Sequence, residues 1–253
     1  MSRSTVLLFF AGLIASSVNA AAGGGTLLSF PALLAAGLSP LAANATSTVG
    51  LLTGYFASVA GYREDMTKLR GEVGATVVPS ILGGAAGAFL LLKLGSEFFS
   101  HIVPWLLIGS SLILIAQPLV AKLVKTSEGV RSKPTVFFAV LAIALYAGYF
   151  GAGVGILFLG AMGLLYGKDL GQVNAIKVFV AMLANVIAAA TFVGLELLHP
   201  TGALVWRAAL PLAIGALFGG VTGVTIARRL SPAVLRGFAA LVGVAIAIDI
   251  IVR

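Results

Sequence analysis

The sequence predicts an all-α polytopic membrane protein that is built from two inverted repeats of about five helical elements each. This prediction rests on the composition of the chain, the recurrence of long apolar segments and an internal duplication. Of the 253 residues, 60% are hydrophobic and 9% are charged, whereas about 25% of the residues of a soluble domain are charged. One transmembrane domain is therefore expected to occupy residues 1–253.

Apolar segments recur from one end of the chain to the other. Two short segments, 26–36 and 156–166, follow glycine clusters, and they are predicted to be half-helices or re-entrant segments because they are too short to cross a bilayer. The others are long enough to cross at about 1.5 Å per residue. These eight segments cover residues 4–21, 41–62, 72–94, 101–124, 135–151, 170–194, 203–227 and 232–252.

The chain aligns with itself, which predicts an internal duplication. The repeats are expected at 4–124 and 134–252, with the polar segment 125–134 as their linker. A shift of 130 residues pairs Ala22-Gly23-Gly24-Gly25 with Ala152-Gly153-Val154-Gly155, Gly37 with Gly167 and Asn44-Ala45 with Asn174-Ala175, and a shift of 132 pairs Pro79 with Pro211, Gly83 with Gly215 and Gly87 with Gly219.

The first apolar segment has the layout of a cleavable signal peptide. Arg3 precedes an apolar run, and the stretch 18–20 offers small residues for cleavage. Residues 4–22 nevertheless correspond to the internal segment 134–152, which no signal peptidase could use. The first helix is therefore expected to be retained as part of the fold.

The basic residues indicate that the two repeats have opposite orientations. The connection at 63–71 contains three Lys or Arg residues, and its counterpart at 194–202 contains none. The next connection, 95–101, contains none, whereas Arg228 and Arg229 mark its counterpart. Because basic residues collect on the cytoplasmic side, the repeat is predicted to be inverted, with both termini outside the cytoplasm. The predicted cytoplasmic set is Arg63, Lys68, Arg70, Lys122, Lys125, Arg131, Lys133, Lys168, Arg228, Arg229 and Arg236, and the opposite set is Arg3, Lys93, Arg207 and Arg253.

The two glycine-rich breaks are candidates for a binding site. Backbone groups that leave a helix at membrane depth must be buried in protein or line a wet cavity. Each break also exposes a helix N-terminus, whose free amides and positive dipole attract anions. The alternative is that the glycines only allow close helix packing. The residues proposed for the anion at these breaks are Gly23, Gly24, Gly25, Thr26, Gly153, Gly155 and Ile156.

A second group of candidates is polar and duplicated. Asn44, Thr46, Ser47 and Thr48 lie near the start of one predicted helix, and Asn174 and Lys177 lie in the equivalent stretch of the other half. The asparagines are expected near the pseudo-two-fold axis, where amide and hydroxyl groups bind anion oxygens and Lys177 supplies a full positive charge. The alternative is that Asn and Thr bond neighbouring helices while Lys177 extends to the membrane interface.

The sequence excludes several other functions. The absence of cysteine excludes disulfides, thiolate metal ligands and a cysteine nucleophile. His101 and His199 lie beside connections without a matched acidic motif, and no nucleotide-binding glycine-lysine loop is present. The net charge of +8 comes from short segments between apolar runs, which is typical of topology signals and not of a nucleic-acid partner. No enzyme activity, cofactor or metal is therefore expected.

Three motifs carry a family resemblance. The first half contains Ala22-Gly23-Gly24-Gly25, then Phe30-Pro31-Ala32-Leu33-Leu34-Ala35-Ala36-Gly37-Leu38-Ser39-Pro40, then Ala43-Asn44-Ala45-Thr46-Ser47. With these motifs the chain resembles the sulfite exporter TauE/SafE family over its whole length. The second half is a degenerate copy, with Gly160-Ala161 opposite Phe30-Pro31 and Lys177 opposite Ser47. The resemblance implies an inner-membrane permease of bacterial or archaeal type for anions such as sulfite, thiosulfate, sulfoacetate, taurine-related sulfonates or sulfolactate.

The predicted function is therefore secondary transport of a small sulfur-containing anion by alternating access. A channel of the same fold is the first alternative, and a membrane enzyme or assembly factor is the second. The expected partners are the anion and the lipid bilayer, and a homo-oligomer is left open. The direction of transport and the coupling ion are also left open.

Overall fold

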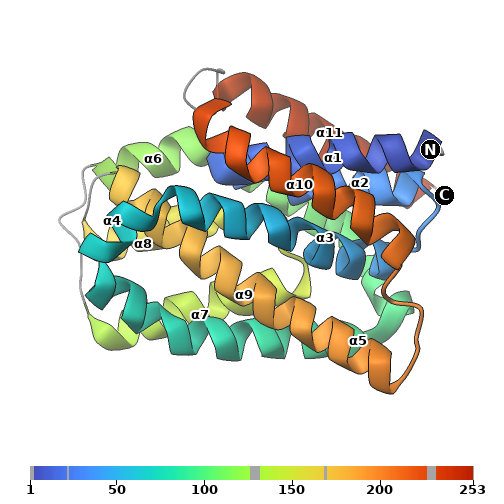
Figure 1. The fold of residues 1–253 in the computed structure, drawn as a ribbon, viewed down its shortest axis with the longest axis horizontal. Coiled ribbons are helices and arrows are strands. Elements are labelled where there is room, and N and C mark those ends of the chain that lie inside the picture. Colours follow the sequence, from blue (N-terminus) through green and yellow to red (C-terminus); the bar gives the residue numbers. More distant parts are fainter. Residues whose placement is uncertain (1–2, 22, 126–131, 168–169, 227–231, 253) are drawn as a thin grey trace.

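The computed structural model describes residues 3–21, 23–125, 132–167, 170–226 and 232–252, and these residues form a bundle of helices (Figure 1). Within this part of the chain there are eleven helices. They are α1 (Arg3–Ala21), α2 (Thr26–Ala35), α3 (Pro40–Gly61), α4 (Arg63–Lys68), α5 (Arg70–Ile115), α6 (Gln117–Lys125), α7 (Lys133–Tyr149), α8 (Val154–Tyr166), α9 (Leu170–Leu198), α10 (Trp206–Ile226) and α11 (Pro232–Val252).

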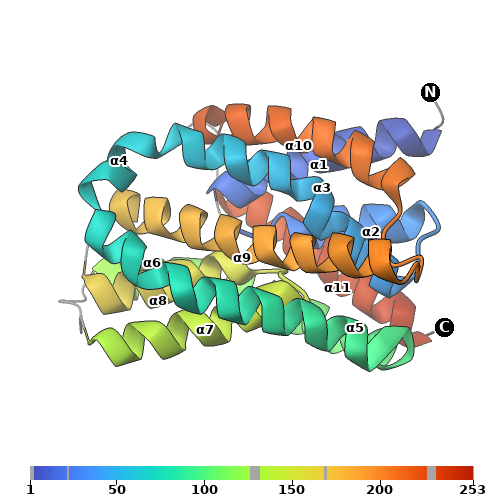
Figure 2. The same cartoon turned by 60° about the horizontal axis from the view of Figure 1, so that its bottom comes forward.

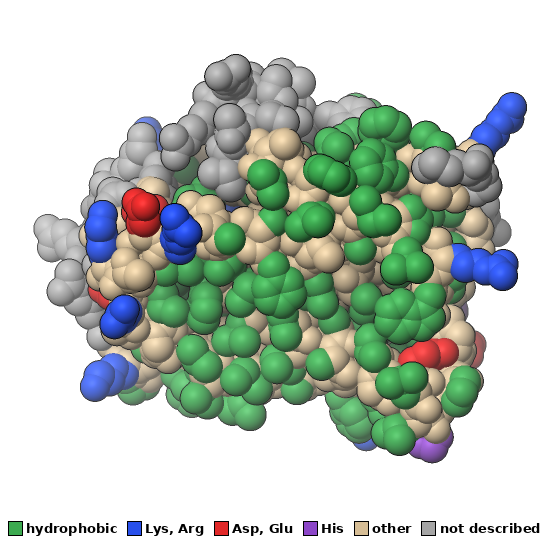
Figure 3. Space-filling view, in the orientation of Figure 1, with side chains coloured by type: hydrophobic (Ala, Val, Ile, Leu, Met, Phe, Trp, Pro, Cys, Tyr) green, Lys and Arg blue, Asp and Glu red, His purple; other side chains and the backbone are tan. Residues whose placement is uncertain are grey.

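The lengths and surfaces of the helices confirm an all-α polytopic membrane protein. By length and composition, α1, α5 and α9 each contain a stretch that is apolar enough to cross a bilayer, and α2, α7, α8, α10 and α11 contribute shorter apolar helices. Large apolar side chains such as Phe89, Trp105 and Phe138 are exposed on the outside of the bundle. The apolar band between two charged ends is visible in Figure 3. Such a surface is stable in lipid.

The two predicted half-helices are present. Helix α2 has 10 residues and α8 has 13, so at about 1.5 Å per residue neither can cross a bilayer alone. Gly23 before α2 and Gly153 before α8 both have φ in the left-handed region, at 83° and 73°, where glycine is strongly preferred. The glycine clusters therefore end the preceding helix and re-aim the chain.

The structure confirms the division of the segment 70–125 near residue 95 and corrects the end of the second helix. Separate helices were expected at 72–94 and 101–124, and the element labelled α5 consists of two helices that meet at Gly95, whose φ of 76° and ψ of −178° are not helical. The second helix ends earlier than expected, because α5 stops at Ile115 and α6 begins at Gln117. Pro118 has no amide hydrogen and cannot continue the hydrogen-bond ladder across this point. The short helix α4 was not predicted.

Contacts between the two proposed repeats come in matched pairs. Helix α1 packs along α10, and α7 packs along α5, as both ribbon views show (Figure 2). Gly215 lies against the carbonyl of Phe9, and Gly83 lies against the carbonyl of Leu141. An offset of 132 residues relates both members of these pairs. Glycine at such positions lets helix backbones approach closely, and the matched contacts support the proposed duplication.

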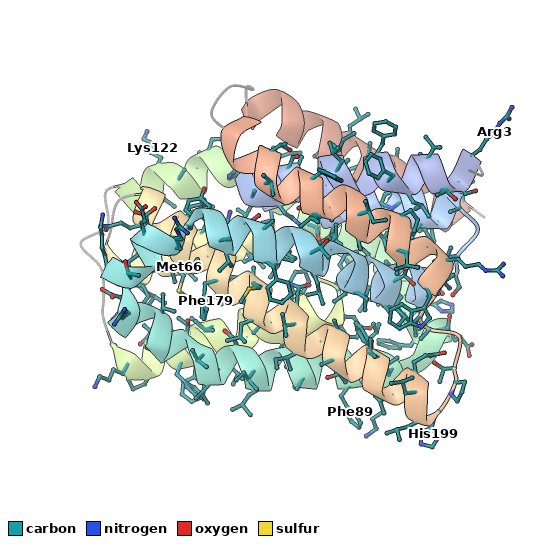
Figure 4. All side chains as sticks on the ribbon, viewed as in Figure 1. Arg3, Met66, Phe89, Lys122, Phe179 and His199 are labelled. Atoms are coloured by element: carbon teal, nitrogen blue, oxygen red, sulfur yellow. The ribbon has the colours of Figure 1, made fainter. Side chains whose placement is uncertain are left out.

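The basic residues that the structure describes divide between the two ends of the bundle. Helices α4, α6 and the start of α7 lie at one end, whereas α1 begins and α11 ends at the other (Figure 1). Lys122 and Arg3 mark these opposite ends in Figure 4. This grouping follows the two predicted charge sets. The structure does not describe the side chains of Lys125, Arg131, Lys168, Arg228, Arg229, Arg236 and Arg253 from those sets.

Candidate functional site

The two glycine-rich breaks cross each other inside the protein. A Cβ atom placed on Gly23 would lie 2.5 Å from the Cα of Gly155, and a Cβ atom on Gly155 would meet the Cα of Gly23 in the same way. Both glycines are buried. The start of α8 and the segment that leads into α2 therefore touch backbone to backbone, and there is no space for a side chain on either one.

A narrow cavity lies beside this crossing, among α1, α3, α8 and α9. Its volume is about 10 Å³, which is room for roughly one water molecule. Helix α1 contributes residues at helical spacing, i, i+3 and i+4, and α9 contributes residues at i, i+1 and i+4. The lining residues are Ser16, Asn19, Ala20, Gly23, Leu51, Gly54, Tyr55, Ser58, Gly155, Lys177, Val178 and Ala181.

Lys177 is the charged group of this cavity. The residue is 2% exposed, and its ammonium group donates to the backbone oxygen of Asn19 at 3.5 Å, at the long limit for a hydrogen bond. No carboxylate in the described ranges forms an ion pair with it. A buried charge without a counter-ion costs several kcal/mol. When Lys177 is protonated, the cavity wall therefore holds an uncompensated positive charge that an anion would neutralise.

Asn19 connects the lysine to the break. Its side-chain oxygen accepts from the amide of Gly25, the residue before α2, at 2.7 Å. Its side-chain nitrogen donates to the phenol oxygen of Tyr55 at 3.4 Å, and its backbone oxygen accepts from Lys177. One residue at the end of α1 thus holds α2, α3 and α9 in register around the cavity.

Further hydrogen-bond donors line the same space. Ser16 is 2% exposed, and its hydroxyl is one of the polar groups of the lining. Gly54 makes room for it, because a Cβ atom there would collide with the Ser16 hydroxyl. The phenol of Tyr55 accepts from Asn19 and keeps its own proton for another partner. Gly155 lies in the first turn of α8, where the helix dipole is positive. Its neighbours Val154 and Ile156 donate their amides to the backbone oxygens of Gly151 and Gly153.

Three of the residues predicted from sequence meet at this cavity: Gly23, Gly155 and Lys177. The other candidates at the breaks lie around them. Gly25 is bonded to Asn19, Gly24 packs on the side chain of Leu114, and Gly153 packs on Ser110. Thr26 and Ile156 are buried in the first turns of α2 and α8.

The duplicated polar residues bond to neighbouring helices and loops instead of lining the cavity. The side-chain amide of Asn44 donates to the backbone oxygen of Tyr149 at 2.8 Å, and that of Asn174 donates to the phenol of Tyr62 at 2.6 Å. The side-chain oxygen of Asn44 is buried without a partner in the described residues. Thr46 accepts from the amide of Val205, Ser47 pairs with Ser29, and Thr48 donates to the backbone oxygen of Asn44.

Sequence reasoning missed the hydroxyl and amide donors of the cavity. Ser16, Asn19 and Tyr55 were not among the residues proposed for the site. A usable signal was present, because Ser16, Asn19 and Gly23 follow one another at i, i+3 and i+7, on one face of a helix that ends in the first break. Tyr55 gave no such signal, since its position at the cavity depends on how α3 packs.

Comparison with known proteins finds a family model and relatives that match most of the chain. A family model described as sulfite exporter TauE/SafE matches residues 8–250. The probable membrane transporter protein ORF9 of Sinorhizobium sp is 28% identical over 247 residues, which cover 96% of this chain and 91% of the relative. The probable membrane transporter protein YfcA of Escherichia coli is 27% identical over 222 residues, covering 86% and 78%. A probable membrane transporter protein of Haemophilus influenzae is 26% identical over 220 residues, covering 86% and 82%.

Proposed function

This chain belongs to the sulfite exporter TauE/SafE family of membrane transporters, and from that premise we propose that it carries a small sulfur-containing anion such as sulfite, thiosulfate or an organosulfonate. The observation that carries the proposal is Lys177, a buried cation without a counter-ion on the wall of a cavity at the crossing of the two breaks. Membrane-buried charges are costly and mark substrate pathways. The anion neutralises Lys177 and accepts hydrogen bonds from Ser16 and Tyr55.

Transport proceeds by alternating access of the two halves around the crossing of Gly23 and Gly155. The matched glycine contacts of α1 with α10 and of α7 with α5 give each half a smooth surface on which the other moves. Inverted repeats provide two equivalent arrangements of this kind, one open to each side of the membrane. In the present arrangement the cavity of about 10 Å³ is too small for an anion, and it must widen to admit one.

A carrier explains the structure better than the two alternatives. A channel requires a continuous path for a hydrated anion, and the cavity holds roughly one water molecule. An enzyme requires a nucleophile with a base, or a metal site, and the described residues contain no cluster of three or more His, Asp or Glu side chains that could hold a metal ion. We therefore propose that the protein is not an enzyme.

Solute counterflow in proteoliposomes tests the carrier proposal. Vesicles loaded with unlabelled sulfite are expected to accumulate labelled sulfite transiently, with a rate that saturates, because a carrier exchanges one bound anion for another. Thiosulfate and methanesulfonate serve as further probes, and protein-free vesicles serve as the control. Flux that rises linearly with concentration and shows no counterflow would indicate a channel, and absence of flux for all three anions would contradict the proposal.

The proposed location is the inner membrane, with both termini outside the cytoplasm. The chain contains no cysteine, so single cysteines introduced for labelling have no background. Leu198→Cys, at the exposed end of α9, is expected to react with an impermeant maleimide added to whole cells, whereas Glu64→Cys in α4 should react only after permeabilisation. Labelling of Glu64→Cys alone in intact cells would reverse the orientation.

A further inference from the structure

We infer that the Lys177 cavity selects an anion with a single negative charge and one apolar face over a doubly charged anion of the same size. This inference rests on the proposed function, since it narrows the substrate class of the same site. It follows from the charge of the cavity, from the number of its donors and from the apolar part of its lining.

The lining of the cavity supplies one positive charge. The lining contains Lys177 and no other Lys, Arg or His. The residue that corresponds to Lys177 in the first half is Ser47, a neutral group that pairs with Ser29 at 2.7 Å. A singly charged anion therefore leaves the occupied cavity neutral. A doubly charged anion leaves one negative charge in surroundings where an unpaired charge is strongly unfavourable.

The donors suit three oxygens better than four. Lys177, Ser16 and Tyr55 supply side-chain donors, and the first turn of α8 adds the backbone near Gly155. Two other polar lining residues already donate within the protein, Ser58 to the backbone oxygen of Gly54 and Asn19 to Tyr55. Four lining residues have no polar side-chain atoms: Ala20, Leu51, Val178 and Ala181. An anion oxygen against these side chains would lose its hydrogen bonds to water without replacement. A methyl or methylene group against them loses nothing, which favours R–SO3⁻ over SO4²⁻.

The second half does not repeat the cavity residues at its equivalent positions. An offset of 130 residues places Tyr146, Tyr149 and Phe150 where the cavity has Ser16, Asn19 and Ala20. The ring of Phe150 is buried and packs on Phe30 with a centroid distance of 5.6 Å. Aromatic side chains thus occupy this region of the second half. The two breaks together therefore form one anion site, on the Lys177 side.

Methanesulfonate and sulfate form the matched pair of probes, since both are tetrahedral and of similar size but carry one and two charges. Binding to the purified full-length protein is measured at pH 7 and constant ionic strength by calorimetry. Methanesulfonate is expected to bind at least about tenfold more tightly than sulfate, the effect of one uncompensated charge. Equal or tighter sulfate binding would overturn the inference and leave the proposed function intact. Absence of binding for both anions and for sulfite would overturn the proposed function itself.

A second measurement tests the apolar lining. Val178→Thr keeps the shape of the side chain and adds a hydroxyl group at a buried lining position. It is expected to lower the preference for methanesulfonate over sulfate several-fold, because sulfate gains a donor for its fourth oxygen. Ala181→Ser provides the same addition on the next turn of α9 if Val178→Thr is not produced in folded form. An unchanged ratio in a folded variant would overturn the role of the apolar lining.

Discussion

Replacing Lys177 with methionine is expected to lower the affinity for the transported anion by about ten- to a hundredfold while it stabilises the folded protein. A charge-assisted hydrogen bond in a buried site contributes roughly 1.5–3 kcal/mol, which corresponds to this loss of affinity. The same charge is buried without a counter-ion, so its replacement by an apolar side chain of similar length removes an unfavourable burial. Calorimetry with sulfite and thermal unfolding in detergent measure the two effects.

The opposite signs of these effects separate a binding role from a structural one. Lys177→Arg is expected to recover part of the affinity, because a guanidinium keeps the charge but differs in shape from an ammonium. Asn44→Ala and Asn174→Ala should give smaller losses, since each asparagine forms a neutral hydrogen bond with another helix or loop and not with the cavity. Lys133→Met, at the exposed start of α7, is the matched control and should change neither property. Unchanged sulfite affinity in Lys177→Met would remove the lysine from the site.

Substitution of alanine for Gly155 is expected to destabilise the protein by about 1–3 kcal/mol, the usual effect of overpacking a buried contact, and to abolish transport. The new methyl group would collide with the backbone of Gly23, which no side-chain rotation relieves. Gly23→Ala should have a larger effect, because its φ of 83° adds the strain of a left-handed alanine. Thermal unfolding in detergent and sulfite counterflow measure both outcomes.

Gly74 and Gly194 provide the controls, because both lie in helices and a Cβ atom on either one meets no neighbouring atom within 4 Å. Their alanine variants should be neutral or more stable by up to roughly 1 kcal/mol, since alanine favours a helix. A Gly155→Ala variant with normal stability and full counterflow would show that the two breaks separate easily, contrary to a crossing that organises the transport site.

The parts of the fold that were predicted from sequence depend on local chemistry. The half-helices α2 and α8 follow from glycine clusters that interrupt apolar runs, and the membrane class follows from composition. The division at Gly95 was predicted, because this glycine and the polar residues after it interrupt the apolar run. The break before Gln117 was missed, since a proline alone does not say whether a helix continues beyond it. Lys177 was selected because an intramembrane charge is conspicuous in any apolar run.

The rest of the cavity could not be predicted because it depends on packing between distant segments. Tyr55 reaches Asn19 across 36 positions in the chain, and Lys177 reaches the same residue across 158. Symmetry suggested that Asn44 and Asn174 would act together, yet each has its own partner, Tyr149 for one and Tyr62 for the other. Two residues at equivalent positions of the repeats therefore need not contact the same neighbour.

The single lysine has a consequence for the history of the chain. If the two repeats descend from one short protein that assembled as an antiparallel homodimer, every side chain near the dimer axis occurred twice. A lysine at the position of Lys177 would then have placed two like charges in the same dry interior, at a cost that the dimer could not offset. Only after duplication had given the two halves separate sequences could one copy carry Lys177 while the other carried the neutral Ser47. Two separate halves therefore allow a charge distribution that a symmetric ancestor could not adopt.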